Sequence, residues 1–221
     1  MAARLSTDFY RRSDVVQVSR DLLGKYLVTL FDGELTAGRI VETEAYRGPD
    51  DKACHAWNNR LTPRTRVMYE QGGHAYVYLC YGIHHLFNVV TAGEGEAHAV
   101  LIRAIEPVDN IELMLARRGF GTVKRQLTAG PGALSKALGI TTAYSGVPLW
   151  SADSPIWIED RGDRIADADI GVSARIGVES AGECALWPWR FFVGASPWVS
   201  GRGRERGREY RICGNDHSFS K

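Results

Sequence analysis

The sequence predicts an α/β protein of the α+β type: one domain with a mixed, mainly antiparallel, curved sheet, surrounding helices and a protruding β-hairpin. Three observations favour this class. Apolar side chains alternate with a period of two along several runs that meet at tight turns such as Asp32-Gly33. Segments with helical spacing are short, and neither a repeat nor a linker divides the chain. Apolar residues make up 44% of the 221 residues, which is enough for a sizeable core.

The first elements are a helix and a hairpin. Residues 13–24 have the spacing of a helix, with Ser13 or Asp14 as its N-cap and Gly24 as its stop. Residues 25–46 then form two strands around Asp32-Gly33, a dipeptide typical of a two-residue hairpin turn.

A meander of three strands and a mixed C-terminal part follow. The strands are expected at 74–82, 83–91 and 97–105, with Tyr81-Gly82 at the tip of the first turn. Helical spacing appears over 106–119, where Gly119 is the expected stop. The remaining expected elements are a short helix at 130–139, late strands within 148–160 and 190–200, and, beyond the domain at 1–200, an Arg/Gly-rich mobile tail at 201–221.

The net charge and the spacing of the cysteines limit the classes of function that the protein can have. The net charge of +1 neither requires nor excludes a polyanionic partner, since a basic face can be balanced by acidic groups elsewhere. The four cysteines are scattered without a C-x-x-C pair, which argues against a disulfide scaffold or a zinc knuckle. No apolar run has the length of a signal peptide or a membrane span, so we expect a soluble, intracellular, cytoplasmic protein that associates with the nucleoid if it is bacterial.

Two carboxylates lie close together on the second strand. In residues 38–51, GRIVETEAYRGPDD, Glu42 and Glu44 are two positions apart, or roughly 6.6 Å along a strand. Such a pair is similar to the acid and base of an inverting glycosidase, whereas the alternative is a solvated strand face. The alternation assigns the residues to two faces: Ile40, Glu42, Glu44 and Tyr46 on one, and Val41, Thr43 and Ala45 on the other.

The segment after this strand carries histidine, aspartate and arginine. His55 with Asp50 and Asp51 could hold a metal, although their spacing matches no known ligand motif. The adjacent His84 and His85 would point to opposite faces of a strand. Arg60, Arg64 and Arg66 form a basic cluster suited to phosphates or to a solvated surface.

Six segments follow one another along the chain: RIVETEAYRGPDDKACHAWNNRLTPRTRVMY, AYVYLCYGIHHLFNVV, AVLIRAIEP, GPGALSKALGI, ARIGV and FFVGASPWVSG. In this order they resemble the signature segments of the alkyladenine (3-methyladenine) DNA glycosylases. The resemblance covers roughly residues 5–200 and leaves out the basic tail.

This resemblance assigns roles in the chemistry. Glu44 matches the general base that activates a water, while Arg103 and the carbonyl of Ile176 match groups that hold this water. Glu42 has no assigned chemistry. Tyr81, otherwise an unusual residue for an exposed turn, resembles the wedge that fills the stack when a nucleotide is extruded.

The resemblance also assigns base recognition. Tyr46, His55 and Tyr78 resemble the walls of the base pocket, where two aromatic planes would grip a flat and often cationic purine. Asn88 resembles a gatekeeper that excludes the 2-amino group of guanine. The implied DNA contacts are Tyr81, Ile83, Thr62 and Arg64.

The function implied by the resemblance is a monofunctional DNA glycosylase of base excision repair. It would flip 3-methyladenine, hypoxanthine, ethenoadenine or 7-methylguanine out of double-stranded DNA, hydrolyse the N-glycosidic bond and leave an abasic site. It would act as a monomer without cofactor, metal or membrane. The alternatives are a metal-dependent hydrolase using Glu44, His55 and Asp50, and a non-catalytic nucleic-acid-binding module.

Overall fold

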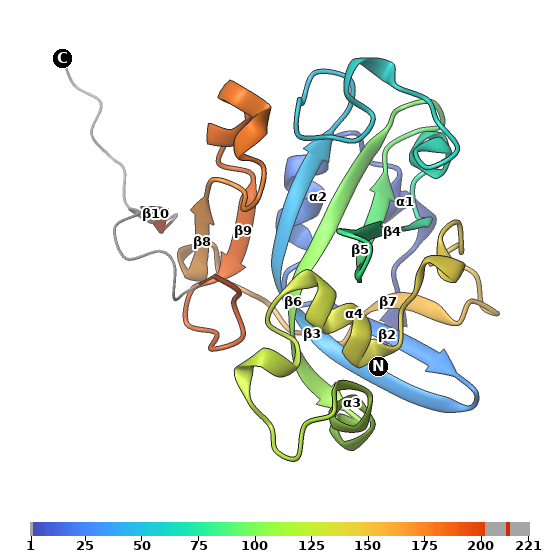
Figure 1. The fold of residues 1–221 in the computed structure, drawn as a ribbon, viewed down its shortest axis with the longest axis vertical. Helices are drawn as coiled ribbons and strands as arrows, with labels where there is room; N and C mark the ends of the chain where they lie inside the picture. Colours follow the sequence, from blue (N-terminus) through green and yellow to red (C-terminus); the bar gives the residue numbers. More distant parts are fainter. Residues whose placement is uncertain (1, 202–210, 213–221) are drawn as a thin grey trace.

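Antiparallel strands dominate the computed structural model, which describes residues 2–201 and 211–212 (Figure 1). The strands are β1 (Ala3–Arg4), β2 (Tyr26–Phe31), β3 (Glu34–Arg47), β4 (Ala75–Cys80), β5 (His84–Thr91), β6 (His98–Asp109), β7 (Ile156–Asp160), β8 (Ile170–Ser173), β9 (Arg190–Val193) and β10 (Arg211–Ile212). The α-helices are α1 (Thr7–Tyr10), α2 (Val15–Asp21), α3 (Ile111–Arg118) and α4 (Pro131–Leu138). Short 3-10 helices lie at Trp57–Asn59, Arg66–Tyr69, Arg125–Leu127, Thr142–Tyr144, Asp167–Asp169 and Glu179–Leu186.

The long strand β3 is the centre of the sheet. The main strand order is β1-β7-β2-β3-β6-β5-β4, and β9 pairs with the C-terminal half of β3, beyond the end of β2. Figure 1 shows β3 and β6 running side by side through the molecule with β8 and β9 to one side. Residues 42–44 are therefore hydrogen-bonded on both sides, by β6 and by β9.

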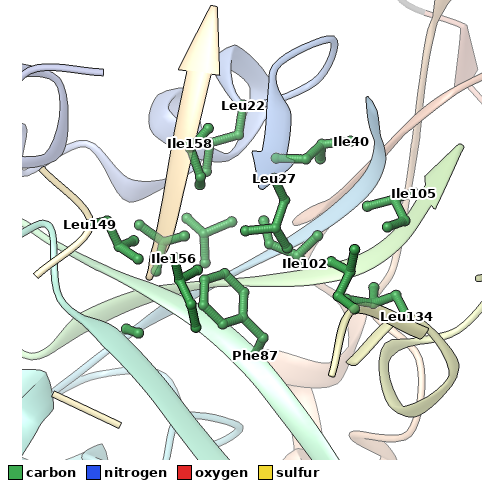
Figure 2. Packing of buried hydrophobic residues seen from close by; sticks show 14 of the residues in the cluster. Leu22, Leu27, Ile40, Phe87, Ile102, Ile105, Leu134, Leu149, Ile156 and Ile158 are labelled. Carbon is green, nitrogen blue, oxygen red and sulfur yellow. The ribbon is translucent and has the colours of Figure 1, made fainter. Parts of the chain in front are cut away.

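One face of the sheet packs in the main core, and the other lines the candidate site. Side chains on one face form the main core with α2 and α4, and Figure 2 shows Leu27, Phe87, Ile102 and Ile156 directed toward one another there. Because neighbouring residues on a strand point to opposite faces, Asn88 and the other alternate residues of β4, β5 and β6 point away from this core. The second face carries the candidate site.

Most predicted elements are confirmed. Asp14 caps α2 by accepting a hydrogen bond from the Gln17 amide at 2.9 Å. Asp32 and Gly33 both have positive φ, as the tight turn between β2 and β3 requires. The meander β4-β5-β6 is present, and Gly119 ends α3 as expected.

Other expectations were wrong. Residues 106–109 continue β6 instead of beginning the helix, because they pair with β3 and Glu106 forms an ion pair with Arg39. In the expected late strands, only 156–160 and 190–193 form strands, and Pro148 makes an isolated bridge with His74. The strands β1 and β8 and the helix α1 were not predicted.

A β-bulge corrects the predicted faces of β3. The register shifts on both sides of Glu42, so that Ile40 packs in the main core with Ala45 while Val41 packs in a separate cluster with Val193. From Glu42 onward the predicted alternation is right.

In the described part of the chain, no helix has both the length and the apolar character needed to cross a membrane. The predicted arginine- and glycine-rich tail spans residues 201–221, of which only 201 and β10 are among the described residues, so that prediction is not tested.

Candidate active site

A cavity of about 480 Å³ opens on the second face of the sheet, over β3, β4, β5 and β6. Strand alternation directs Tyr76 and Tyr78 of β4, Leu86 and Asn88 of β5, and Ala99, Leu101 and Arg103 of β6 into it. The lining includes eight residues predicted for the site and others around them: Tyr46, Ala53, Cys54, His55, Arg64, Met68, Tyr76, Tyr78, Leu79, Cys80, Tyr81, Leu86, Asn88, Ala99, Leu101, Arg103, Pro131, Ile176, Gly177 and Val178.

Aromatic rings make up much of the wall. The centroid of Tyr78 lies 4.6 Å from that of His55 with the planes nearly perpendicular, and 5.5 Å from that of Tyr76. The Arg64 guanidinium carbon lies 4.7 Å from the centroid of Tyr78, so a cation already rests on this ring. The site can thus hold a flat, electron-poor group against an aromatic face.

Glu44 lies beneath this cavity and is completely buried. Its Oε1 accepts a hydrogen bond from the Ile176 amide at 2.8 Å, and its Oε2 accepts from the Tyr46 hydroxyl at 2.8 Å and from Arg103 Nη1 at 3.2 Å. An ionised carboxylate can accept about four hydrogen bonds. Three are used, which leaves accepting capacity on Oε1.

Glu42 is also completely buried but is saturated. Its Oε1 accepts from Arg190 Nε at 2.7 Å, from the Ser200 hydroxyl at 2.9 Å and from Arg103 Nε at 3.1 Å. Its Oε2 accepts from the Ser200 amide at 2.5 Å. Two carboxylates and two guanidinium groups therefore form a charge-balanced buried cluster, and a solvated strand face is excluded.

The electrostatics of the cluster follow from its burial and its charges. Burial alone would lower the pKa of Arg103, but the carboxylates of Glu44 and Glu42 outweigh this effect and raise it. Burial, followed by the neighbouring Glu44, raises the pKa of Tyr46 well above its usual range. Arg103 thus keeps its charge and Tyr46 its proton, so both remain donors toward Glu44.

His55 is held as a neutral ring. Burial and the nearby Arg64 lower its pKa from 6.5 to about 4. Its Nδ1 lies 2.8 Å from the Tyr76 hydroxyl, and Arg64 Nη2 lies 3.2 Å from its Nε2. Because a guanidinium only donates, Nε2 accepts and the proton of the ring lies on Nδ1.

The alternative metal site is not supported by this arrangement. Asp50 forms an ion pair with Arg47, while Asp51 forms a buried ion pair with Arg175. Over the described residues, no three histidine, cysteine or acidic side chains lie together as metal ligands would. The two aspartates bind arginines instead, and the Asp51–Arg175 pair fixes the segment that presents the Ile176 amide.

Asn88 is fixed by its backbone neighbours. Its Nδ2 donates to the carbonyl of Tyr76 at 3.0 Å and to that of Leu86 at 3.3 Å. The side chain is buried in the cavity wall. Its amide cannot turn freely, and an incoming group meets it in one orientation.

The predicted wedge is fully presented to solvent. Tyr81 is 89% exposed at the tip between β4 and β5, where Tyr81 and Gly82 both have positive φ and the Ile83 amide donates to the Cys80 carbonyl. Ile83 is 70% exposed beside it. Two large, exposed hydrophobic side chains at the tip of a hairpin are suited to insertion into another structure.

The predicted DNA contacts divide into two groups. Arg64 and Tyr81 line the mouth of the cavity, whereas Thr62 and Ile83 lie outside its lining. The Thr62 amide and hydroxyl contact the Thr65 hydroxyl, so Thr62 stabilises the basic loop that carries Arg64.

The sequence reasoning missed several residues of this region. Tyr76 could have been found, because it alternates with Tyr78 on the same strand. Arg190 and Ser200 carried no local signal, because they reach Glu42 from 148 and 158 positions away. Arg175 precedes the predicted residue Ile176, but nothing in the sequence identifies Asp51 as its partner.

Comparison with known proteins identifies the family of this chain. Residues 8–197 match the family described as methylpurine-DNA glycosylase (MPG). A relative from Bacillus cereus (strain G9842) is 45% identical over 198 residues, which cover 87% of this chain and 96% of the relative. A relative from Chlamydia pneumoniae is 46% identical over 199 residues, which cover 90% and 98%. Both bear the name "Putative 3-methyladenine DNA glycosylase". With its sheet, its buried glutamates and this likeness along most of its length, the chain belongs to the methylpurine-DNA glycosylase family.

Proposed function

We propose that this DNA glycosylase excises alkylated or deaminated purines from double-stranded DNA by means of a water that Glu44 activates. The substrate class comprises 3-methyladenine, the lesion in the relatives' name, and hypoxanthine, ethenoadenine and 7-methylguanine. The observation that carries the proposal is a completely buried carboxylate beneath an aromatic cavity, with capacity on Oε1 for one more donor.

Size and chemistry of the cavity support a purine as the bound group. A volume of about 480 Å³ lies in the usual range for small-molecule pockets. The base would stack on Tyr78 and Tyr46, and a positive charge on an alkylated base would add cation–π attraction. Arg64, which rests on Tyr78 in the free protein, would move aside and be available for a phosphate.

The reaction follows from the donors and acceptors around Glu44. A water donating to Oε1 would attack C1′ of the deoxyribose and pass its proton to the carboxylate, while the purine leaves with the electron pair of the glycosidic bond. Arg103 and Tyr46, both donating to Oε2, would orient the carboxylate so that Oε1 faces the sugar. The carboxylate would also stabilise the positive charge that develops on the sugar.

Different residues would extrude the nucleotide and select the base. Tyr81 would enter the stack as the nucleotide leaves, where a stacked ring offsets about 1–3 kcal/mol of the lost stacking. The fixed amide of Asn88 would meet the base edge and exclude the 2-amino group of guanine.

Monofunctional chemistry is part of the proposal. Strand cleavage by a glycosylase needs an amine that forms a Schiff base with the sugar. The described residues that line the cavity include arginine and histidine but no lysine. Water would therefore be the nucleophile, and the product would be an abasic site in an intact strand.

The test uses duplexes with single hypoxanthine, ethenoadenine or 7-methylguanine lesions, and alkylated DNA as the source of 3-methyladenine. Release of free base without strand breakage, unchanged in excess chelator, is expected. Release that stops in chelator would favour a metal-dependent hydrolase. Tight binding of the lesion without release of any base would favour a non-catalytic nucleic-acid-binding module.

A further inference from the structure

Glu42 and Ser200, which do not line the cavity, orient the guanidinium group of Arg103. Its three guanidinium nitrogens have three different acceptors: Nη1 donates to Glu44, Nε to Glu42, and Nη2 to the Ser200 hydroxyl at 3.4 Å. Only Glu44 belongs to the proposed chemistry. The other two acceptors fix the plane of the guanidinium, because its donors have a rigid geometry.

Ser200 is the link between these acceptors. Its hydroxyl donates to Glu42 and accepts from Arg103, and its amide donates to Glu42 as well. The residue is almost completely buried. Loss of the hydroxyl would leave Glu42 with one donor fewer and Arg103 Nη2 without this acceptor.

The chain around Ser200 is itself held firmly. Arg190 Nη2 donates to the Ser200 carbonyl at 3.0 Å. Arg125 donates to the Val199 carbonyl through Nε and Nη2 at 3.2 and 2.5 Å. Two arginines on different elements thus fix the backbone, so the Ser200 hydroxyl is a rigid reference point for Arg103.

We propose that Ser200 is a positioning residue for base excision, acting on Glu44 through Glu42 and Arg103. The proposal rests on the proposed function, since it assigns a role within that reaction. Ser200 touches neither the cavity nor Glu44. Its effect is to keep Arg103 on Oε2 of Glu44, which leaves Oε1 directed at the water. A displacement of about 1 Å in a reacting group can cost about 100-fold in rate.

The experiment compares Ser200→Ala with Ser196→Ala. Ser196 is a serine of the same segment with the same exposed fraction, 6%, but its hydroxyl accepts from the Trp198 amide and lies outside the charge cluster. Single-turnover excision of hypoxanthine at saturating enzyme, affinity for the same duplex, and the thermal unfolding midpoint are measured for each protein. Ser200→Thr, which restores a hydroxyl, is the rescue variant.

We expect Ser200→Ala to lower the single-turnover rate by about 10- to 100-fold while affinity changes by less than about twofold. Ser196→Ala should keep the wild-type rate, and Ser200→Thr should recover most of it. If Ser200→Ala lowers the yield of folded protein, Ser200→Cys, with a weak donor of similar size, replaces it.

Equal rates for Ser200→Ala and Ser196→Ala, or a loss in Ser200→Ala that appears only as weaker binding, would overturn the positioning role. The proposed function is judged separately, by the wild-type protein. If the wild type releases no base from any lesion, the glycosylase proposal fails before the variants are compared.

Discussion

Substitution of Glu44 by glutamine is the most direct test of the proposed chemistry. Glutamine has nearly the same size but cannot take a proton from water, so the general base is lost. Removal of such a group typically lowers the rate by about 10²–10⁴-fold, which corresponds to about 3–5 kcal/mol in the activation barrier. Binding of the lesion should be retained, since the aromatic walls are unchanged.

The surroundings of Glu44 also predict a cost in stability. The carboxylate accepts from three donors, but a glutamine side chain has one oxygen and one NH₂ group. If the oxygen keeps Arg103 and Tyr46, the NH₂ group faces the Ile176 amide, donor against donor. If the oxygen instead accepts from the Ile176 amide, the NH₂ group faces the Arg103 guanidinium, which is also a donor. Either orientation leaves a buried donor unsatisfied, so the free energy of unfolding should fall by about 1–3 kcal/mol.

Single-turnover excision of hypoxanthine at saturating enzyme, duplex affinity and urea unfolding measure the three effects. Glu106→Gln is the matched control: it removes a carboxylate of the same sheet that pairs with Arg39 outside the cavity, so it should excise at the wild-type rate. Excision by Glu44→Gln within about threefold of wild type would refute the assignment of the base.

Three further predictions concern binding, selection and pH. Tyr81→Ser should reduce extrusion of a fluorescent base by about 5- to 150-fold, the equivalent of one lost stacking contact of 1–3 kcal/mol, and equal extrusion would contradict the wedge role. Asn88→Ser should increase release of guanine from mismatched pairs, because a smaller side chain admits the 2-amino group; unchanged release would argue against the gatekeeper. The low pKa of His55 means that, between pH 6.5 and about 4, the unfolded chain binds a proton that the folded protein does not. As the pH falls through this window, the free energy of unfolding should therefore decrease by up to about 3 kcal/mol. Urea unfolding of His55→Gln should show a pH dependence that is smaller by that amount. The same pH dependence in both proteins would contradict the low pKa of His55.

Local signals account for the elements that the sequence predicted. The turn at Asp32-Gly33 and the helix ends at Asp14 and Gly119 depend on the chemistry of single residues, so they can be recognised without the fold. The strand β8 has only four residues and forms because β9 lies beside it, which no local pattern reveals.

Long-range contacts explain what was missed at the site. From the ETE triplet alone, an exposed strand face was the simpler reading. The carboxylates are buried only because Arg103 arrives from 59 and Arg190 from 148 positions away. The face of Ile40 was assigned wrongly because a bulge inserts a residue that the alternation cannot anticipate.

The separation of these charges along the chain has a consequence for biosynthesis. Glu42 and Glu44 leave the ribosome with β3, whereas Arg190 and Ser200 follow 148 and 158 positions after Glu42. Burying Glu42 before Arg190 has been made would be costly, so we expect the middle of the sheet to stay hydrated until β9 pairs with β3. A nascent chain that ends before β9 thus carries every aromatic residue of the cavity while Glu42 still lacks Arg190 and Ser200. We therefore expect no excision from such a truncated chain.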